Sequence, residues 1–267
     1  MGAMFNHPSK RSSFKGRRWL TSRGVGSVSQ TVNRYQAIKY RLLVAEALRV
    51  AKKFYSYREL SRITGIPEGM LSRYVTGHVI PSIEQAERIW RALEKALDPR
   101  RIVAERIREL GGLIDLTPIL TNPLTLRIIS VYFYNRLAGK NITRILVPET
   151  SGITLATTLA MVFDVPMAIA RRVRDNPYED YIEGSYVEPP SHYVVFYVPR
   201  RQLSRGDRVL VVDDIIQTGR TLAALRRIVE EAGARITAVA ALVVVGDEWR
   251  RRAGIEEVEA LVTIGKP

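Results

Sequence analysis

The stretch 209–221 constrains the fold of this chain more than any other. Its first four residues are aliphatic, and an unbroken aliphatic run is typical of a strand buried on both faces of a parallel sheet. Asp213 and Asp214 follow, and a Thr-Gly-Arg-Thr turn at 218–221 leads into a helical pattern that we expect to begin at Leu222. The sequence therefore predicts an α/β unit in which a strand passes through a tight turn into a helix.

This turn predicts an anion site. At the start of a helix the first backbone N–H groups lack partners, and the helix dipole favours negative charge. Thr218 and Thr221 add hydroxyl donors, and Gly219 allows the backbone to approach a ligand closely. Because two carboxylates would repel a phosphate, Asp213 and Asp214 need another partner, such as ribose hydroxyls or Mg²⁺. We therefore expect a ligand that carries both a sugar and a phosphate.

The order of these residues resembles the phosphoribosyl-diphosphate (PRPP) motif of type I phosphoribosyltransferases. That motif has an aliphatic strand, two acids, two aliphatic residues, one variable residue and Thr-Gly-x-Thr. A generic strand-to-helix turn in another α/β fold is the alternative. The resemblance implies a type I phosphoribosyltransferase-like parallel sheet, with Mg²⁺ bound together with PRPP by Asp213 and Asp214. The residues that it implies for the ribose, the metal and the 5′-phosphate are Asp213, Asp214, Gln217, Thr218, Gly219, Arg220 and Thr221.

Two further segments follow predicted strands, where parallel sheets bind ligands. One lies after a strand predicted at 142–147, and it resembles the diphosphate loop of the family, whose backbone amides hold the leaving group. The other lies after a strand predicted at 166–170, where the family has a basic pair, and guanidinium groups there suit diphosphate oxygens. The diphosphate-binding residues implied by the resemblance are Glu149, Thr150, Ser151, Gly152, Arg171 and Arg172.

The segment 175–191 and Trp249 can each be interpreted in two ways. The polar segment 175–191 stands where the family has a mobile flap over the site, and an ordinary surface hairpin is the alternative. Trp249 follows a strand predicted at 239–245. Its ring would stack on a nucleobase, which makes it the candidate base-binding residue, or it would anchor the C-terminal strand at 258–264.

The net charge of +14 is concentrated in the N-terminal part. Residues 1–112 hold 22 of the 41 Lys and Arg but 9 of the 27 Asp and Glu, so they carry +13 and the remainder carries +1. This asymmetry predicts a polyanion-binding module attached to a nearly neutral domain, and a basic soluble surface is the alternative. Residues 1–31 contain no acid, and we expect a basic flexible arm that reaches along DNA or stays solvated.

The region 32–97 has the spacing of a helix-turn-helix. Apolar residues follow a helical period from about 33 to 53, and Ser56 with Glu59 matches a capping box at the start of a short helix. Gly65 permits a sharp turn before the next helix. The pattern resembles the Cro/phage-repressor class, and a helical bundle that only mediates dimerisation is the alternative. By position, the candidates for DNA contact are Glu68, Gly69, Ser72 and Arg73 in the major groove and Thr76 and His78 at phosphates.

The tandem order resembles archaeal transcription regulators described as orotate-phosphoribosyltransferase-like. It implies a homodimer that binds a palindromic DNA operator and senses PRPP or a purine- or pyrimidine-related nucleobase or nucleotide. The alternative is an active nucleobase phosphoribosyltransferase with an appended helical module. Gln217 weakens that alternative, because the 6-oxopurine transferases have an aspartate there that acts on the purine, and an amide cannot serve as a general base. The expected division is an arm at 1–31, a helix-turn-helix domain at 32–97, a helical linker at 98–112 and a ligand-binding domain at 113–267.

The amino-acid composition argues against a metal site built by the protein alone and against a membrane protein. The chain has no cysteine and three scattered histidines, so we expect no protein-built metal site apart from Mg²⁺ that arrives with PRPP. No apolar run approaches the ~20 residues that cross a membrane, and the first residues lack the apolar core of a signal peptide. We therefore expect a cytoplasmic protein with no membrane partner.

Overall fold

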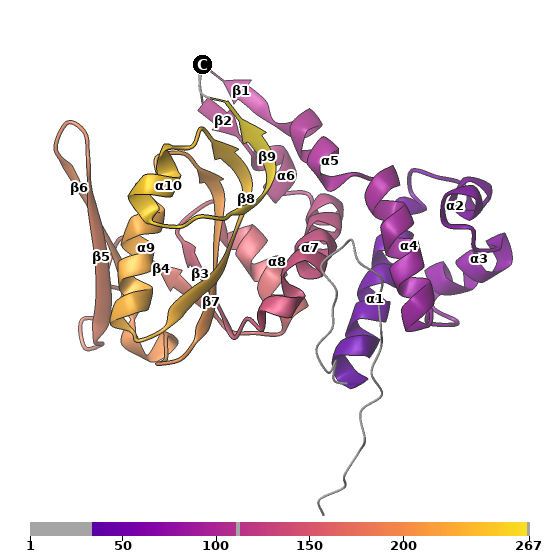
Figure 1. The fold of residues 1–267 in the computed structure, drawn as a ribbon, viewed down its shortest axis with the longest axis horizontal. Helices are drawn as coiled ribbons and strands as arrows, with labels where there is room; N and C mark the ends of the chain where they lie inside the picture. The colour runs from indigo at the N-terminus through magenta and orange to yellow at the C-terminus, as the bar shows by residue number, and fades with distance from the viewer. Residues whose placement is uncertain (1–33, 111–112, 266–267) are drawn as a thin grey trace, which may run out of the picture.

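The computed structural model describes residues 34–110 and 113–265. A group of helices at the N-terminal side stands beside a parallel sheet with helices on both faces (Figure 1). The predicted arm at 1–31 lies outside the described residues. The helices of the N-terminal side are α1 (Arg34–Ala51), α2 (Tyr57–Thr64), α3 (Glu68–Thr76), α4 (Ile83–Ala96) and α5 (Pro99–Arg106).

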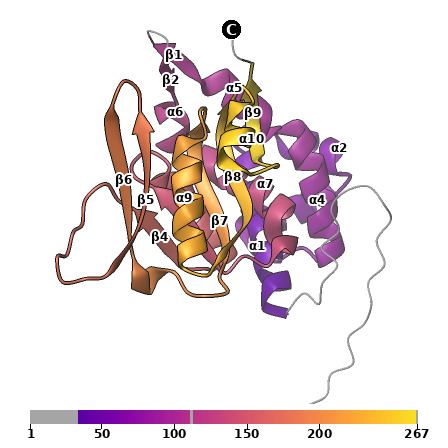
Figure 2. The same cartoon turned by 60° about the vertical axis from the view of Figure 1, so that its left-hand side comes forward.

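The central sheet has five strands in the order β4-β3-β7-β8-β9, and all neighbouring pairs are parallel. Helices α7 and α8 cover one face (Figure 1), and α9 with the β5–β6 hairpin covers the other (Figure 2). The strands of the sheet are β3 (Arg144–Pro148), β4 (Met167–Ala170), β7 (Arg208–Ile216), β8 (Arg235–Val245) and β9 (Glu259–Ile264). The covering elements are α7 (Pro123–Leu137), α8 (Ile153–Phe163), β5 (Tyr181–Glu188), β6 (His192–Pro199) and α9 (Arg220–Glu231).

Shorter elements complete the chain. The segment β1–β2 is an antiparallel hairpin, and α10 follows β8. These elements are β1 (Arg108–Leu110), β2 (Leu113–Asp115), α6 (Thr117–Leu120), the 3-10 helices Ala138–Lys140 and Arg200–Gln202, and α10 (Glu248–Ala253). The predicted helical linker at 98–112 is wrong in its second half, because helix α5 ends at Arg106 and β1 pairs with β2 from Arg108.

The aliphatic run at 209–212 is buried on both faces, as expected of a parallel strand. Leu210 and Val212 pack with α7 and α8, whereas Val209 and Val211 pack with α9 and the hairpin. Successive strand residues point to opposite faces, so only a strand covered on both sides can bury four aliphatic residues in a row. The two apolar clusters therefore meet at β7, and this strand carries the candidate acids at its end.

The turn between α2 and α3 follows the predicted pattern. The capping box is present: the Glu59 N–H donates to Ser56 Oγ, and the Ser56 N–H donates to Glu59 Oε2 at 2.7 Å. Gly65 has φ +66°, a left-handed conformation that favours glycine. Ile66 is buried between the helices, together with Leu71 of α3. In helix α1 the apolar period predicted from about 33 to 53 holds in the second half, where Leu48 and Val50 are buried, whereas the apolar residues at positions 38 and 42 face solvent.

The N-terminal helices share one apolar core with the sheet side. The rings of Tyr40 on α1 and Tyr134 on α7 stack with their centroids 6.3 Å apart. Arg127 on α7 lies 3.5 Å from Glu46 on α1. The buried residues of α1 to α4 form one continuous cluster with those of α7 and α8. Any rotation of the helices relative to the sheet must therefore repack this cluster.

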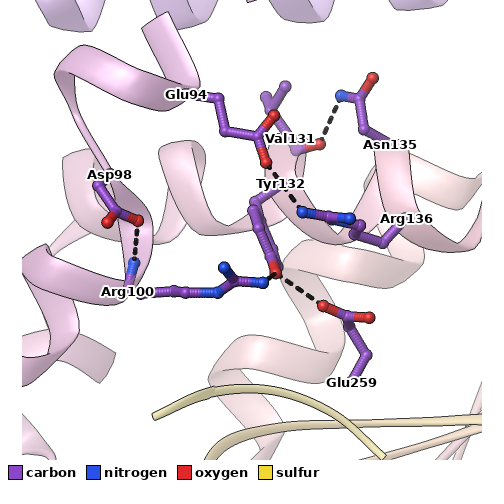
Figure 3. A network of polar contacts seen from close by, with 8 residues as sticks. All are labelled: Glu94, Asp98, Arg100, Val131, Tyr132, Asn135, Arg136 and Glu259. Carbon is purple, nitrogen blue, oxygen red and sulfur yellow. Dashed lines mark hydrogen bonds and ion pairs between the residues drawn. The ribbon is translucent and has the colours of Figure 1, made fainter. Parts of the chain in front are cut away.

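A polar network centred on Tyr132 adds a second connection (Figure 3). The Tyr132 hydroxyl accepts from Arg100 Nη2 of α5 at 2.7 Å and donates to Glu259 Oε1 of β9 at 2.7 Å. Burial, and then the bond to Glu259, raise the pKa of Tyr132 to about 12, so the hydroxyl keeps its proton at neutral pH. Beside it, Arg136 donates to Glu94 of α4. The network thus joins α4 and α5 to α7 and to an edge strand of the sheet.

Candidate functional site

A pocket of about 280 Å³ opens at the carboxyl ends of β3 and β7. This is the end of a parallel sheet at which such folds bind ligands. Its lining brings together the loop after β3, Arg172, the two acids of β7 and the start of α9. The lining residues are Pro148, Glu149, Thr150, Ser151, Gly152, Arg172, Phe196, Asp213, Asp214, Ile215 and Thr221.

The two acids stand on β7 itself, which continues past them to Ile216. Both are half-buried. Asp213 Oδ1 accepts the Asp214 N–H at 3.0 Å, and Asp214 Oδ1 accepts the Ile215 N–H at 2.9 Å, so local backbone bonds orient both carboxylates. Burial, and then the charge of Asp214, raise the pKa of Asp213 well above its ordinary value. The pocket floor therefore favours a cation or a hydrogen-bond donor beside these acids.

The loop after β7 turns sharply into α9. Gly219 has φ +74° and precedes the helix, which starts at Arg220 and thus two residues before the expected position. Thr221 lines the pocket, and Arg252 Nη1 donates to the Thr218 carbonyl oxygen at 2.7 Å. A twelve-residue helix therefore points its N-terminus at the pocket end, with a guanidinium beside it.

Trp249 does not line the pocket. The residue is 2 % exposed, and its Nε1 donates to the Gly246 carbonyl oxygen at 3.2 Å. A β-carbon at Gly219 would lie 2.7 Å from the Trp249 Cα, so the loop and α10 are in close contact. The interpretation of Trp249 as a base-stacking residue is therefore wrong for this structure, because the side chain is buried and the Trp249 backbone lies against the loop.

Of the two arginines predicted at the diphosphate end, Arg172 lines the pocket and Arg171 does not. Arg171 lies 3.0 Å from Asp175 in an exposed ion pair, and its backbone pairs with Tyr197. The Arg172 backbone N–H donates to Glu149 Oε1 at 2.6 Å. The structure therefore brings one guanidinium to the pocket and closes the loop after β3 onto the end of β4. The peptide bond that follows Glu149 is cis.

The segment predicted as a flap or a hairpin contains β5, which pairs with β6 over its whole length. This hairpin packs on α9: a β-carbon at Gly184 would lie 2.8 Å from Ile228 Cγ1. In this structure the segment is therefore part of a hairpin that packs on α9, as the second of the two interpretations expects. Phe196 of β6 lines the pocket and was missed by sequence reasoning. Its signal was the alternation of apolar residues in β6, where Val194 and Val198 are also buried.

The candidates for DNA contact lie on α3 and the turn after it. Most of their side chains are exposed, and Ser72 is half-buried. Thr76 Oγ1 donates to the Ser72 carbonyl oxygen at 2.8 Å and lies 2.7 Å from His78 Nδ1. The exposed members of the set are Glu68, Gly69, Arg73, Thr76 and His78. They lie on one exposed side of α3 and in the turn after it.

The described residues form neither a metal cage of their own nor a membrane-spanning helix. At residues 34–110 and 113–265, no three or more His, Cys, Asp or Glu side chains gather as a metal cage. Within the same residues, none of the helices combines the length and apolar character needed to cross a membrane. Carboxylate oxygens are hard ligands that suit Mg²⁺, so Asp213 and Asp214 fit a cation whose other ligands come from a bound molecule.

The chain belongs to the family described as the phosphoribosyl transferase domain, whose sequence model matches residues 116–266. The fold is the type I phosphoribosyltransferase fold, preceded by an all-helical region. A solved adenine phosphoribosyltransferase from Thermoanaerobacter pseudethanolicus matches with a TM-score of 0.57 and 21 % identity, over 62 % of this chain and 99 % of that chain. At this identity the match shows the fold.

Two curated relatives differ in function. An adenine phosphoribosyltransferase from Anaeromyxobacter sp. is 32 % identical over 56 % of this chain and 84 % of its own length. The purine biosynthesis transcriptional repressor PurR of Bacillus subtilis is 26 % identical over 79 % of this chain and 71 % of its own length. The second alignment extends beyond residues 116–266 and into the N-terminal helices. This chain is thus similar both to an enzyme and to a regulator.

Proposed function

We propose that this protein is a DNA-binding transcription regulator whose phosphoribosyltransferase-type domain senses PRPP or a purine- or pyrimidine-related ligand. The observation that carries the proposal is the docking of the helical region on the ligand domain through one continuous apolar core. A merely appended module would need no such core. The alignment with the repressor PurR across most of the chain supports the same function.

The ligand binds in the pocket between the loop after β3 and the start of α9. Asp213 and Asp214 accept from the ribose hydroxyls, and Thr218 with Thr221 and the α9 amides binds the 5′-phosphate. Mg²⁺, when it arrives with the ligand, would be held by the two aspartates and would neutralise part of the charge there. Phe196 is the one aromatic residue in the lining, and at 1 % exposure it lies behind the polar groups that face the ligand.

The exposed side of α3 reads DNA. Glu68, Gly69, Ser72 and Arg73 face the major groove, and Thr76 with His78 contacts phosphates. The +13 charge of residues 1–112 supplies the sequence-independent attraction to the DNA backbone. A homodimer presents two α3 helices, so the operator is a palindrome whose half-site spacing matches the dimer.

Ligand binding changes DNA affinity through the shared core. The pocket loop contacts α10, and β9 is joined through Glu259 and Tyr132 to α5. A shift of the loop can therefore alter how the N-terminal helices sit on α7, and with it the distance between the two α3 helices of the dimer. The pocket and the DNA-binding side of α3 would thus be coupled, because both depend on how the N-terminal helices pack on α7.

A second candidate function is PRPP-dependent nucleobase phosphoribosyl transfer. The observation in its favour is the pocket itself, which has the paired acids and the phosphate loop of a family that includes adenine phosphoribosyltransferases. Gln217 argues against it, because an exposed amide offers no general base at this position. Turnover of PRPP with a panel of nucleobases at enzyme-like rates would establish this second function.

Footprinting tests the proposed function. The full-length protein is incubated with DNA from upstream of its own gene, with and without PRPP or nucleoside monophosphates, at moderate salt. A protected palindrome whose occupancy changes with ligand is the expected result. No protection under either condition would contradict DNA-binding regulation. The control for Arg73→Ala is Arg101→Ala. Arg101 is exposed on α5, away from α3, and its loss changes the net charge by the same amount.

A further inference from the structure

Helix α8 exposes a stripe without charged side chains. None of its eleven residues is charged, although charged residues make up 25 % of the chain. Its exposed side chains are those of Thr154, Thr157 and Met161, whose spacing places them on one face of the helix. Met161 is 74 % exposed. A surface helix ordinarily carries charged side chains on the face that it turns to solvent, so this stripe is a candidate contact surface.

Helix α1 carries a second uncharged stripe. From position 35 to position 42, the exposed side chains of α1 are those of Tyr35, Gln36, Ile38 and Leu42. The two helices meet at Asp164, directly after α8, where the Tyr35 hydroxyl donates to the carboxylate at 3.2 Å and Lys39 Nζ lies 3.8 Å from it. We call the exposed residues of the two stripes together the α1–α8 surface.

Helix α7 lies between α1 and α8 and connects them (Figure 1). The centroid of the Tyr134 ring on α7 lies 6.3 Å from that of Tyr40 on α1 and 5.3 Å from that of Phe163 on α8. The buried residues of the three helices belong to one apolar cluster. The α1–α8 surface therefore spans the helical region and the phosphoribosyltransferase domain.

Charge decides which partner fits this surface. DNA or an acidic protein would be attracted by lysine and arginine, and the exposed residues of the two stripes include neither. Charged groups stand at its edge: Arg34 begins α1, and Lys39 pairs with Asp164 of the same chain. Two copies of a protein with a net charge of +14 repel each other wherever their basic surfaces face. In an isologous contact the groups near the two-fold axis meet their own copies, so an uncharged surface brings no like charges together.

We infer that the α1–α8 surface is the contact through which two copies of this chain form a two-fold symmetric dimer. Ile38, Leu42 and Met161 become buried against the second copy, which removes apolar area from water. Helix α1 also packs against α3, so a contact through α1 holds the two α3 helices of the dimer at a set distance. The inference rests on the proposed function, in which the regulator is a homodimer, and it names the surface of that dimer.

Single glutamates on the two helices test the interface. In one chain, Met161→Glu and Leu42→Glu place a carboxylate at an exposed position, where water solvates it. In the dimer, the same carboxylate is buried against apolar side chains or lies beside its own copy. The matched control is Leu113→Glu, which makes the same change at a leucine of β2 that is 75 % exposed and lies outside the α1–α8 surface. Thermal unfolding establishes that each variant is folded.

Sedimentation velocity of the full-length proteins, without DNA or ligand, measures the association. The wild type and L113E should sediment as dimers. M161E and L42E should raise the dissociation constant of the dimer by about a hundredfold and should sediment as monomers at the same concentration.

A chemical cross-link locates the contact without adding charge. The chain has no cysteine, so Met161→Cys introduces a single thiol. A bis-maleimide reagent at low protein concentration should join two M161C chains covalently. Leu113→Cys, treated in the same way, should remain a single chain on a denaturing gel.

Three results would overturn the inference. They are a monomeric wild type, wild-type dimerisation of both M161E and L42E, and cross-linking of M161C that does not exceed that of L113C. Each of them leaves the proposed function standing, because footprinting measures DNA protection and its response to ligand separately. Absence of protection, in contrast, contradicts the proposed function and leaves the sedimentation result unchanged.

Discussion

Gly219 and Trp249 are in direct contact, and no side chain larger than hydrogen fits between them. A β-carbon at Gly219 would lie 2.7 Å from the Trp249 Cα and 2.8 Å from its carbonyl oxygen. The same glycine has φ +74° at the start of α9. The loop between β7 and α9 is therefore shaped by a tryptophan 30 positions later in the chain, which connects this loop to α10.

Gly219→Ala should destabilise the protein by about 2–4 kcal/mol, since it combines a left-handed residue with an overpacked contact. Gly206→Ala is the matched control, because Gly206 has φ +85° but open space around its β-carbon position. That control should lose about 1 kcal/mol from backbone strain alone. Chemical denaturation measures both. Equal losses in the two variants would show that the contact with Trp249 does not matter.

Asp213→Asn should stabilise the ligand-free protein at pH 7 by about 1 kcal/mol, as substitutions of strained functional residues often do. Burial and Asp214 raise the pKa of Asp213 in the folded state, so the native protein binds this proton more tightly than the unfolded chain. The stability that protonation provides is present at low pH and is lost as pH rises through the raised pKa. The gain of Asp213→Asn should therefore shrink as pH falls toward about 4.

Thermal unfolding of both proteins across this pH range measures the effect. A variant that is less stable than the wild type at pH 7 would contradict the account of Asp213. The amide oxygen of asparagine can still accept the Asp214 N–H, so the local backbone bond is kept in the variant.

Tyr132→Phe should uncouple the two parts of the chain. Removing the hydroxyl breaks the bonds to Arg100 and Glu259 and should cost about 1 kcal/mol of stability. Ligand affinity should stay within about twofold of wild type, while the effect of ligand on DNA affinity falls. Tyr134→Phe is the control on the same helix, because the Tyr134 hydroxyl has no bonding partner within the described part of the chain. A Tyr132→Phe variant with unchanged coupling would exclude this network.

Arg73→Ala should weaken operator binding by about 1–3 kcal/mol and should leave ligand affinity unchanged. Arg73 is exposed on α3, and no residue of α3 lines the pocket. The measurement is a gel-shift titration on the footprinted site, beside the Arg101→Ala control. If both variants lost the same affinity, Arg73 would act only through net charge.

Local patterns predicted the backbone of this protein well. The aliphatic run before Asp213 lies in a parallel strand buried on both faces, and Ser56 with Glu59 caps α2 as expected. Both features depend on residues close in sequence, whose geometry follows from hydrogen-bonding needs at strand and helix ends. Most of the pocket lining was predicted from the resemblance to the family's motifs, together with the rule that the ends of parallel strands meet at one edge.

Several of the errors depend on side-chain contacts that the local pattern does not determine. The sequence alone could not distinguish a stacking Trp249 from a buried one, since the answer depends on the close approach of Gly219. It could not separate Arg172 from Arg171, because Asp175 attracts one and the pocket receives the other. The bond between Tyr132 and Glu259 joins residues 127 positions apart, and no local periodicity reports such a pair.

The central claim is that a ligand in the Asp213 pocket controls DNA binding. Its most direct test is the DNA affinity of the full-length wild-type protein and of Asp213→Asn, measured by fluorescence anisotropy on the footprinted operator at fixed salt, with and without saturating nucleotide. The account predicts that ligand changes wild-type affinity by about fivefold or more and leaves the variant unchanged. Equal ligand response in the two proteins, or no response in the wild type, would contradict it.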